Sequence, residues 1–136
     1  MSGETTPSAE VLRNTLDAYF AAIAALDPQR IASVFAKDGE IEDPVGSPIR
    51  HGRDEVAGLF ACGVAALASH VKIKVLAAIP SGNSIAAHWT MTARGKAGRE
   101  IEAEGIDVLR VDQHGQIVRA EGYWNAAAFR QVLAAN

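Results

Sequence analysis

Three residues of this 136-residue sequence carry side chains that can move protons, at positions where such side chains are uncommon. Tyr19 lies on the apolar stripe of an expected helix, and Asp43 ends a short alternating segment before a proline. Asp107 shares a strand face with Ile101 and with small apolar residues. An acid on an inward face must be paired with a cation or be protonated, and alternation places no cation beside Asp107. Proton transfer and hydrogen-bond donation are therefore the chemistry to consider.

Each of the three residues also has a purely structural explanation. Tyr19 could be a core tyrosine whose hydroxyl bonds to the backbone, and Asp107 could be a strand-end aspartate near solvent. Asp43 could be a turn residue, because Pro44 lacks an N–H and favours extended geometry at the residue before it. The local sequence leaves both explanations open, so the elements that position these residues have to be considered.

The first half of the chain predicts mainly helices. Residues 1–6 are small and polar and are expected to be loose, and Thr6–Pro7 is typical of a helix start. Asp27–Pro28 repeats this signal and predicts a second helix through Val34 and Phe35 that ends at Gly39. The first helix is expected to run to about residue 25, because apolar residues recur at spacings of four and three: Leu12, Leu16, Tyr19 and Ile23.

The middle and second half of the chain predict strands. A short strand over residues 40–43 and a helix over residues 53–62 come first, followed by alternating segments at 71–75 and 84–94. The clearest period-two run places glutamates on one face and Asp107 on the other: Glu100, Glu102 and Glu104 against Ile101, Ala103, Gly105 and Asp107. A strand over residues 116–124 and a short helix begun by Asn125 close the chain.

Helices followed by a meander of strands indicate an α+β fold. Because short turns join the strands, we expect a curved, mostly antiparallel sheet. Helices packed on one face of such a sheet would leave a conical pocket for a small molecule.

Composition limits the function classes. The length suits a single domain over residues 1–136, and a net charge of −3 offers no basic surface to a nucleic acid. The absence of a long apolar run and of an apolar leader predicts no membrane segment and a cytoplasmic location. Cys62 is the only cysteine, and the four histidines are scattered, so we expect neither a disulfide nor a metal site.

Two stretches resemble a known family. Residues 18–56, which include Glu42-Asp43-Pro44-Val45-Gly46, resemble the opening half of bacterial ketosteroid isomerases, and residues 105–124 resemble their closing strands. These enzymes belong to the wider nuclear-transport-factor-like and polyketide-cyclase-like superfamily, whose cystatin-like cone fold supports many functions. The resemblance implies a steroid Δ-isomerase without a cofactor, acting as a homodimer on a small apolar ketone, expected to be a 3-ketosteroid.

The resemblance also implies a role for each matching residue. Asp43 matches the general base, and Tyr19 and Asp107 match two donors to the oxyanion, with Asp107 protonated. Trp124 matches a residue that lines the steroid pocket. Phe35 and Phe60 occupy substrate-pocket positions where some members have tyrosines that extend the hydrogen-bond network.

Other interpretations remain open. The segment 84–94 matches the family poorly and includes His88 and Trp89, which could alter the pocket's shape. A cone-fold epoxide hydrolase would need Arg99 or Arg119 to point inward between two acids, and a polyketide cyclase is a related possibility. A non-catalytic module that binds apolar ligands is a third interpretation, although it would have no use for two acids.

Overall fold

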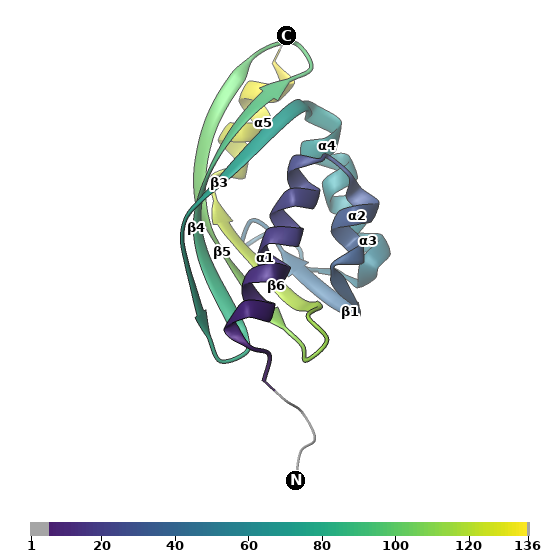
Figure 1. Cartoon of the computed structure of the whole chain (residues 1–136). Coiled ribbons are helices and arrows are strands. Elements are labelled where there is room, and N and C mark those ends of the chain that lie inside the picture. The colour runs from purple at the N-terminus through teal and green to yellow at the C-terminus, as the bar shows by residue number, and fades with distance from the viewer. Residues whose placement is uncertain (1–5, 136) are drawn as a thin grey trace.

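The computed structural model describes residues 6–135, which form five helices and one curved sheet (Figure 1). The expected loose segment at residues 1–6 lies outside the described residues except for Thr6. The helices are α1 (Ala9–Ala24), α2 (Pro28–Ser33), α3 (Gly52–Cys62), α4 (Val64–Leu67) and α5 (Ala126–Ala134). The strands are β1 (Phe35–Glu42), β2 (Arg50–His51), β3 (Ala68–Ser81), β4 (Ser84–Gly95), β5 (Glu100–Val111) and β6 (Ile117–Trp124).

The six strands form one mixed sheet in the order β2-β1-β6-β5-β4-β3. All neighbouring pairs are antiparallel except β1 and β6, which run parallel. The sheet curves around α1 to α4, and α5 covers its far end beside β4 and β5 (Figure 1). The expected α+β architecture, with a curved and mostly antiparallel sheet against N-terminal helices, is confirmed.

Local signals set most helix ends as expected, with one correction at the first helix. Ser8, not Thr6, caps α1, because the Ser8 hydroxyl accepts a hydrogen bond from the backbone N–H of Val11 at 3.1 Å. Asp27 caps α2 and Asn125 caps α5 in the same way, each bonding to the N–H three residues later. These polar caps define where the helices that cover the sheet begin.

The second helix is shorter than predicted. It ends at Ser33, and Phe35 begins strand β1 instead of closing the helix. Phe35 pairs with Ile117 of β6 and is fully buried, so sheet pairing and core packing overrule the local helical pattern. Gly39 lies within β1, where a Cβ atom would come 2.7 Å from the carbonyl oxygen of Ile117, so glycine permits this close approach.

The alternating pattern of β5 is confirmed by burial. Its glutamates are exposed, while Gly105 and Asp107 are buried on the face toward the helices. Both the sheet and α1 contribute to one apolar core, which includes Leu12, Leu16, Ile41, Ile85, Leu109 and Ile117. No helix within residues 6–135 is both long and apolar enough to cross a membrane.

Candidate active site

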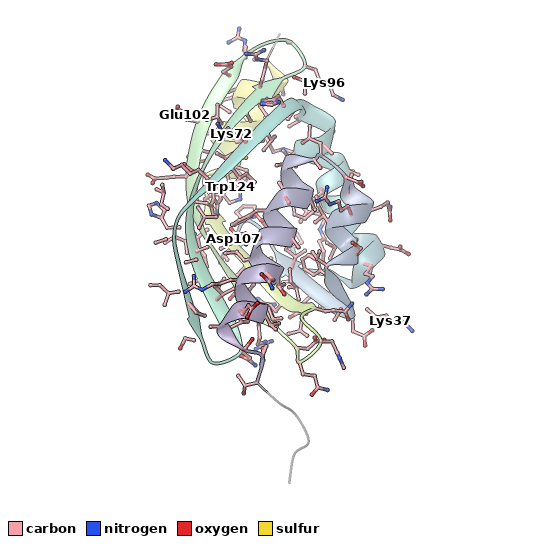
Figure 2. All side chains as sticks on the ribbon, viewed as in Figure 1. Lys37, Lys72, Lys96, Glu102, Asp107 and Trp124 are labelled. Carbon is pink, nitrogen blue, oxygen red and sulfur yellow. The ribbon has the colours of Figure 1, made fainter. Side chains whose placement is uncertain are left out.

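A cavity of about 250 Å³ lies between the concave face of the sheet and helices α1, α3, α4 and α5. Among the described residues, Asp43 and Asp107 are the only acids in its lining, and Arg50 and Arg130 are its only basic side chains. Asp107 and Trp124 lie on the side of the sheet that faces the helices (Figure 2). The rest of the lining is mainly apolar and includes Ile23, Leu59, Phe60, Ile73, Met91 and Phe129. An apolar ligand with one polar end would fit this distribution.

Asp43 follows the end of β1 and is half-buried at the cavity wall. The indole N–H of Trp124 donates a hydrogen bond to its Oδ1 at 2.6 Å. Burial raises the pKa of Asp43 to about 6, and the bond from Trp124 opposes that rise by stabilising the carboxylate. At pH 7 the group is therefore mainly ionised and able to accept a proton.

Asp107 lies near the middle of β5 and is 4% exposed. The indole N–H of Trp89 donates to its Oδ1 at 2.9 Å. Burial is the largest cause that raises the pKa of Asp107 well above its usual value, and the nearby charge of Asp43 adds to it. The Trp89 hydrogen bond acts in the opposite direction. The two aspartates therefore favour different protonation states: a neutral Asp107 beside an ionised Asp43.

Tyr19 is fully buried in α1, and its hydroxyl has no hydrogen-bond partner among residues 6–135. Its ring contacts three phenylalanines, with centroid distances of 5.6 Å to Phe20, 5.8 Å to Phe35 and 6.3 Å to Phe60. Burial raises the pKa of Tyr19, and the charges of Asp107 and Asp43 raise it further. Tyr19 is therefore a neutral hydrogen-bond donor without an acceptor, and it lies close enough to Asp43 and Asp107 for their charges to affect its pKa.

The predicted substrate-binding residues separate into two groups. Phe60 and Trp124 line the cavity, whereas Phe35 does not. Phe35 is fully buried against the edge of the Tyr19 ring, because β1 brings it beneath α1. Its predicted contact with substrate is thus replaced by a contact with Tyr19. Tyr19 is not among the lining residues, although its ring packs against Phe20 and Phe60, which are.

Two glycines make room for the aspartate–indole pairs. A Cβ atom on Gly122 of β6 would lie 2.7 Å from Cγ of Asp43, so the Asp43 carboxyl group lies directly against the backbone of β6. A Cβ atom on Gly105 of β5 would lie 2.6 Å from the Trp89 ring and 2.8 Å from Cβ of Trp124. Real Cβ atoms do not approach so closely, so both positions require glycine for this arrangement.

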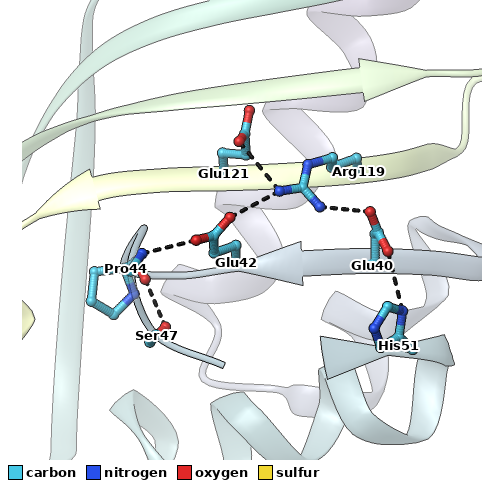
Figure 3. Close-up of polar contacts among 8 residues, drawn as sticks. Glu40, Glu42, Pro44, Ser47, His51, Arg119 and Glu121 are labelled. Carbon is cyan, nitrogen blue, oxygen red and sulfur yellow. Dashed lines mark hydrogen bonds and ion pairs between the residues drawn. The ribbon is translucent and has the colours of Figure 1, made fainter. Parts of the chain in front are cut away.

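A polar network on the outer face of the sheet holds the loop that carries Asp43 (Figure 3). Arg119 of β6 forms ion pairs with Glu40 at 2.6 Å and Glu42 at 2.9 Å on the neighbouring β1. Glu42 in turn accepts a hydrogen bond from the N–H of Gly46 at 2.9 Å, and Ser47 donates to the Pro44 carbonyl at 2.6 Å. The turn after Asp43 is thereby tied to β1 through Glu42 and closed on itself through Ser47.

Trp89 is the site residue whose role the sequence did not predict. Its signal was present in the alternation of β4, where Ile85, Ala87, Trp89 and Met91 are all buried on one face. What the sequence did not contain was the register of β4 on β5. That register sets Trp89 opposite Gly105, two pairs away from the Ala87–Asp107 pair.

Comparison with known proteins identifies the class of this fold and cavity. Residues 16–120 match the SnoaL-like domain, so the chain belongs to the SnoaL-like family of cone-fold proteins. A curated relative, the steroid Delta-isomerase of Nocardioides simplex, is 30% identical over 117 residues, which cover 86% of this chain and 91% of that protein. The resemblance to the isomerase family is thus confirmed.

A solved structure supports the same fold. The epoxide hydrolase/cyclase-like enzyme SalBIII, described in pyran ring formation in polyether salinomycin, aligns with a TM-score of 0.75. The alignment covers 87% of this chain and 93% of that chain at 20% sequence identity. At this identity the likeness concerns the fold and does not extend to the reaction.

Proposed function

We propose that this protein is a steroid Δ-isomerase, which moves a β,γ double bond of a 3-ketosteroid into conjugation with the ketone. The observation that carries the proposal is one apolar cavity that holds two carboxyl groups with opposite protonation preferences. The 30% identical relative named as a steroid Delta-isomerase supports the same reaction.

The reaction needs a base that takes a proton from one carbon and returns it to another. The Asp43 carboxylate accepts the proton from the carbon between the carbonyl and the double bond. The C–H electrons form a new double bond, and the carbonyl π electrons move onto oxygen to give a dienolate. Asp43, now protonated, then delivers the proton to the far end of the dienolate, and the conjugated ketone forms with every atom retained.

The developing oxyanion needs hydrogen-bond donors that are already in place. Protonated Asp107 is one donor, and the partnerless hydroxyl of Tyr19 is the second. The apolar walls exclude water and keep the effective dielectric low, which strengthens both hydrogen bonds. No group outside the chain is required for these proton movements.

The competing interpretations fit the cavity less well. An epoxide hydrolase of the acid–arginine–acid type requires an arginine between the acids, but Arg119 pairs with glutamates on the outer face of the sheet. Arg99 is exposed and is not part of the cavity lining. Arg50 and Arg130 do line the cavity, but among the described residues neither forms an ion pair with Asp43 or Asp107. A binding module for apolar ligands would gain nothing from the desolvation of two carboxyl groups.

The decisive experiment is direct. Purified protein is mixed with a β,γ-unsaturated 3-ketosteroid, and the ultraviolet absorbance of the conjugated enone is followed. We expect the absorbance to rise with wild-type protein and to be strongly reduced with Asp43→Asn. Absence of turnover with folded wild-type protein would refute the proposed function.

We further propose that the protein is a homodimer that associates through the outer face of the sheet. Ile106 of β5 and Tyr123 of β6 are paired neighbours on that face, and they are 46% and 47% exposed. A second copy of this chain would cover both side chains. Light scattering at micromolar concentration tests the proposal: Tyr123→Lys should shift the mass from dimer to monomer, whereas a monomeric wild type would exclude it.

A further inference from the structure

Trp89 forms the one hydrogen bond that the described residues make to the carboxyl group of Asp107. Its indole nitrogen lies 2.9 Å from Oδ1, and both side chains are almost fully buried. An indole N–H can only donate, and the carbonyl-type oxygen of a neutral carboxylic acid is a better acceptor than its hydroxyl oxygen. With Oδ1 as the acceptor, a neutral Asp107 therefore favours its proton on the other oxygen, Oδ2.

We propose that Trp89 is a positioning residue, which holds Oδ1 of Asp107 as an acceptor so that Oδ2 presents its proton to the substrate oxygen. This assignment rests on the proposed function, because it gives the direction of a hydrogen bond in the proposed isomerisation. Asp107 lines the cavity, so the oxygen not bound by the indole is the one available to a ligand.

The surroundings of Trp89 hold its ring in this position. Trp89 lies opposite Gly105, and its ring occupies the space that any larger residue at 105 would fill. Its ring also packs edge-on against Trp124 at a centroid distance of 5.7 Å, and Trp124 packs against Phe129 at 5.1 Å. The indole therefore has little freedom to rotate away from Asp107.

The hydrogen bond also strengthens the donor that it orients. When the carbonyl-like oxygen of an acid accepts a hydrogen bond, the group is polarised, and its O–H becomes a better donor. Trp89 thus has two effects on Asp107: it selects the oxygen that carries the proton, and it makes that proton more effective toward an oxyanion.

A double-mutant cycle between Trp89→Phe and Asp107→Asn tests the assignment through activity. With Trp89 present, the amide that replaces Asp107 turns its oxygen to the indole and its NH₂ group to the substrate, so kcat should fall by less than about tenfold. Without the indole the amide can reverse. We expect the double variant to lose about tenfold more in kcat than the two single losses combined, with KM little changed.

Met91→Ala is the matched control for the loss of volume. Met91 lies on the same face of β4, also lines the cavity and loses three heavy atoms, as Trp89→Phe does. It forms no hydrogen bond to Asp107, so its effects on kcat should combine additively with Asp107→Asn. If the effects of Trp89→Phe and Asp107→Asn on kcat were also additive, Trp89 would only fill space, and the proposal would fail.

A second substitution separates the N–H group from the shape of the ring. Benzothienylalanine incorporated at position 89 keeps the fused ring and replaces the N–H group with sulfur. We expect it to reproduce the kcat loss of Trp89→Phe. Wild-type kcat with this ring would overturn the proposal even if Trp89→Phe proved unstable.

Nuclear magnetic resonance gives a readout that does not depend on turnover. The chain has two tryptophans, so two indole N–H signals can be assigned by single substitutions. The Trp89 signal should shift on Asp107→Asn, while the Trp124 signal should follow the ionisation of Asp43 near pH 6. If the wild type were inactive but the Trp89 signal still shifted on Asp107→Asn, the isomerase function would be refuted and the Trp89–Asp107 hydrogen bond retained. If the enzyme were active but the Trp89 signal did not shift, the positioning role of Trp89 would be refuted.

Discussion

Replacement of Tyr19 by phenylalanine should change stability and activity in opposite directions. The substitution removes one oxygen and keeps the ring that contacts Phe20, Phe35 and Phe60. That oxygen is buried without a partner among the described residues, and an unsatisfied buried polar group costs about 1–3 kcal/mol. Because a small void remains after its removal, we expect Tyr19→Phe to raise the free energy of unfolding by about 1 kcal/mol.

The same oxygen is a proposed donor to the dienolate. Loss of one oxyanion donor typically lowers kcat by about 10²–10³-fold, or about 3–4 kcal/mol in the activation barrier. Urea unfolding followed by tryptophan fluorescence measures the stability change, because Trp89 and Trp124 are both in the folded interior wall of the cavity. Enone absorbance measures kcat on the same preparations.

Thr15→Val is the control on the same helix. The Thr15 hydroxyl is also buried but donates to the carbonyl oxygen of Gly115 at 2.7 Å. Its removal leaves that carbonyl without its partner, so we expect a loss of about 1 kcal/mol in stability and an unchanged kcat. If Tyr19→Phe behaved like Thr15→Val, losing stability and keeping kcat, the Tyr19 hydroxyl would be structural and the donor role would be refuted.

Four further predictions concern the two aspartates and their glycine. Asp43→Asn should lower kcat by at least about 10²–10⁴-fold but keep product binding, since the amide oxygen still accepts the Trp124 N–H; near-normal turnover would exclude the base role. Because the pKa of Asp43 is raised from 3.8 to about 6, kcat/KM should rise with pH through about 6, and a profile that is flat from pH 5 to 7 would contradict this. Gly122→Ala, which pushes a methyl group into the Asp43 carboxyl, should reduce kcat more than stability, as paired kinetic and urea measurements would show. The pKa of Asp107 is raised in the folded state, so the stability contributed by its neutral form is fully present below the unfolded pKa of about 3.9 and is lost as pH rises toward the folded pKa. Asp107→Asn should therefore not lower the free energy of unfolding at pH 8, whereas Asp107→Leu should abolish most turnover.

The sequence by itself determined the features that depend on neighbouring residues. Alternation over residues 100–107 placed Asp107 on the inner face of β5, and the structure confirms its burial. Asp27 and Asn125 set helix starts because their side chains bond to N–H groups only three residues away. Signals of this kind are local, so they can be recognised without knowledge of the tertiary fold.

Other features were decided only by the tertiary structure. Phe35 has a helical neighbourhood in sequence, yet pairing with Ile117 and burial beneath Tyr19 make it the first residue of β1. The family resemblance assigned Phe35 to the substrate pocket, but Phe35 packs against the Tyr19 ring and is not among the residues that line the cavity. Long-range packing outweighs propensities of a few tenths of a kcal/mol per residue, which is why local patterns failed here.

The hydrogen-bond partners of the two aspartates were also decided only by the tertiary structure. Trp89 reaches Asp107 across 18 positions, and Trp124 reaches Asp43 across 81, through the registers of β4 on β5 and β6 on β1. Irregularities in these pairings, such as the shift between Phe35 and Glu40, decide which side chains meet. A register shift of one residue turns every side chain to the other face of a sheet. The residue types of the site can therefore be identified from the sequence, whereas the hydrogen bonds between the two aspartates and the two tryptophans form only when the whole sheet is assembled.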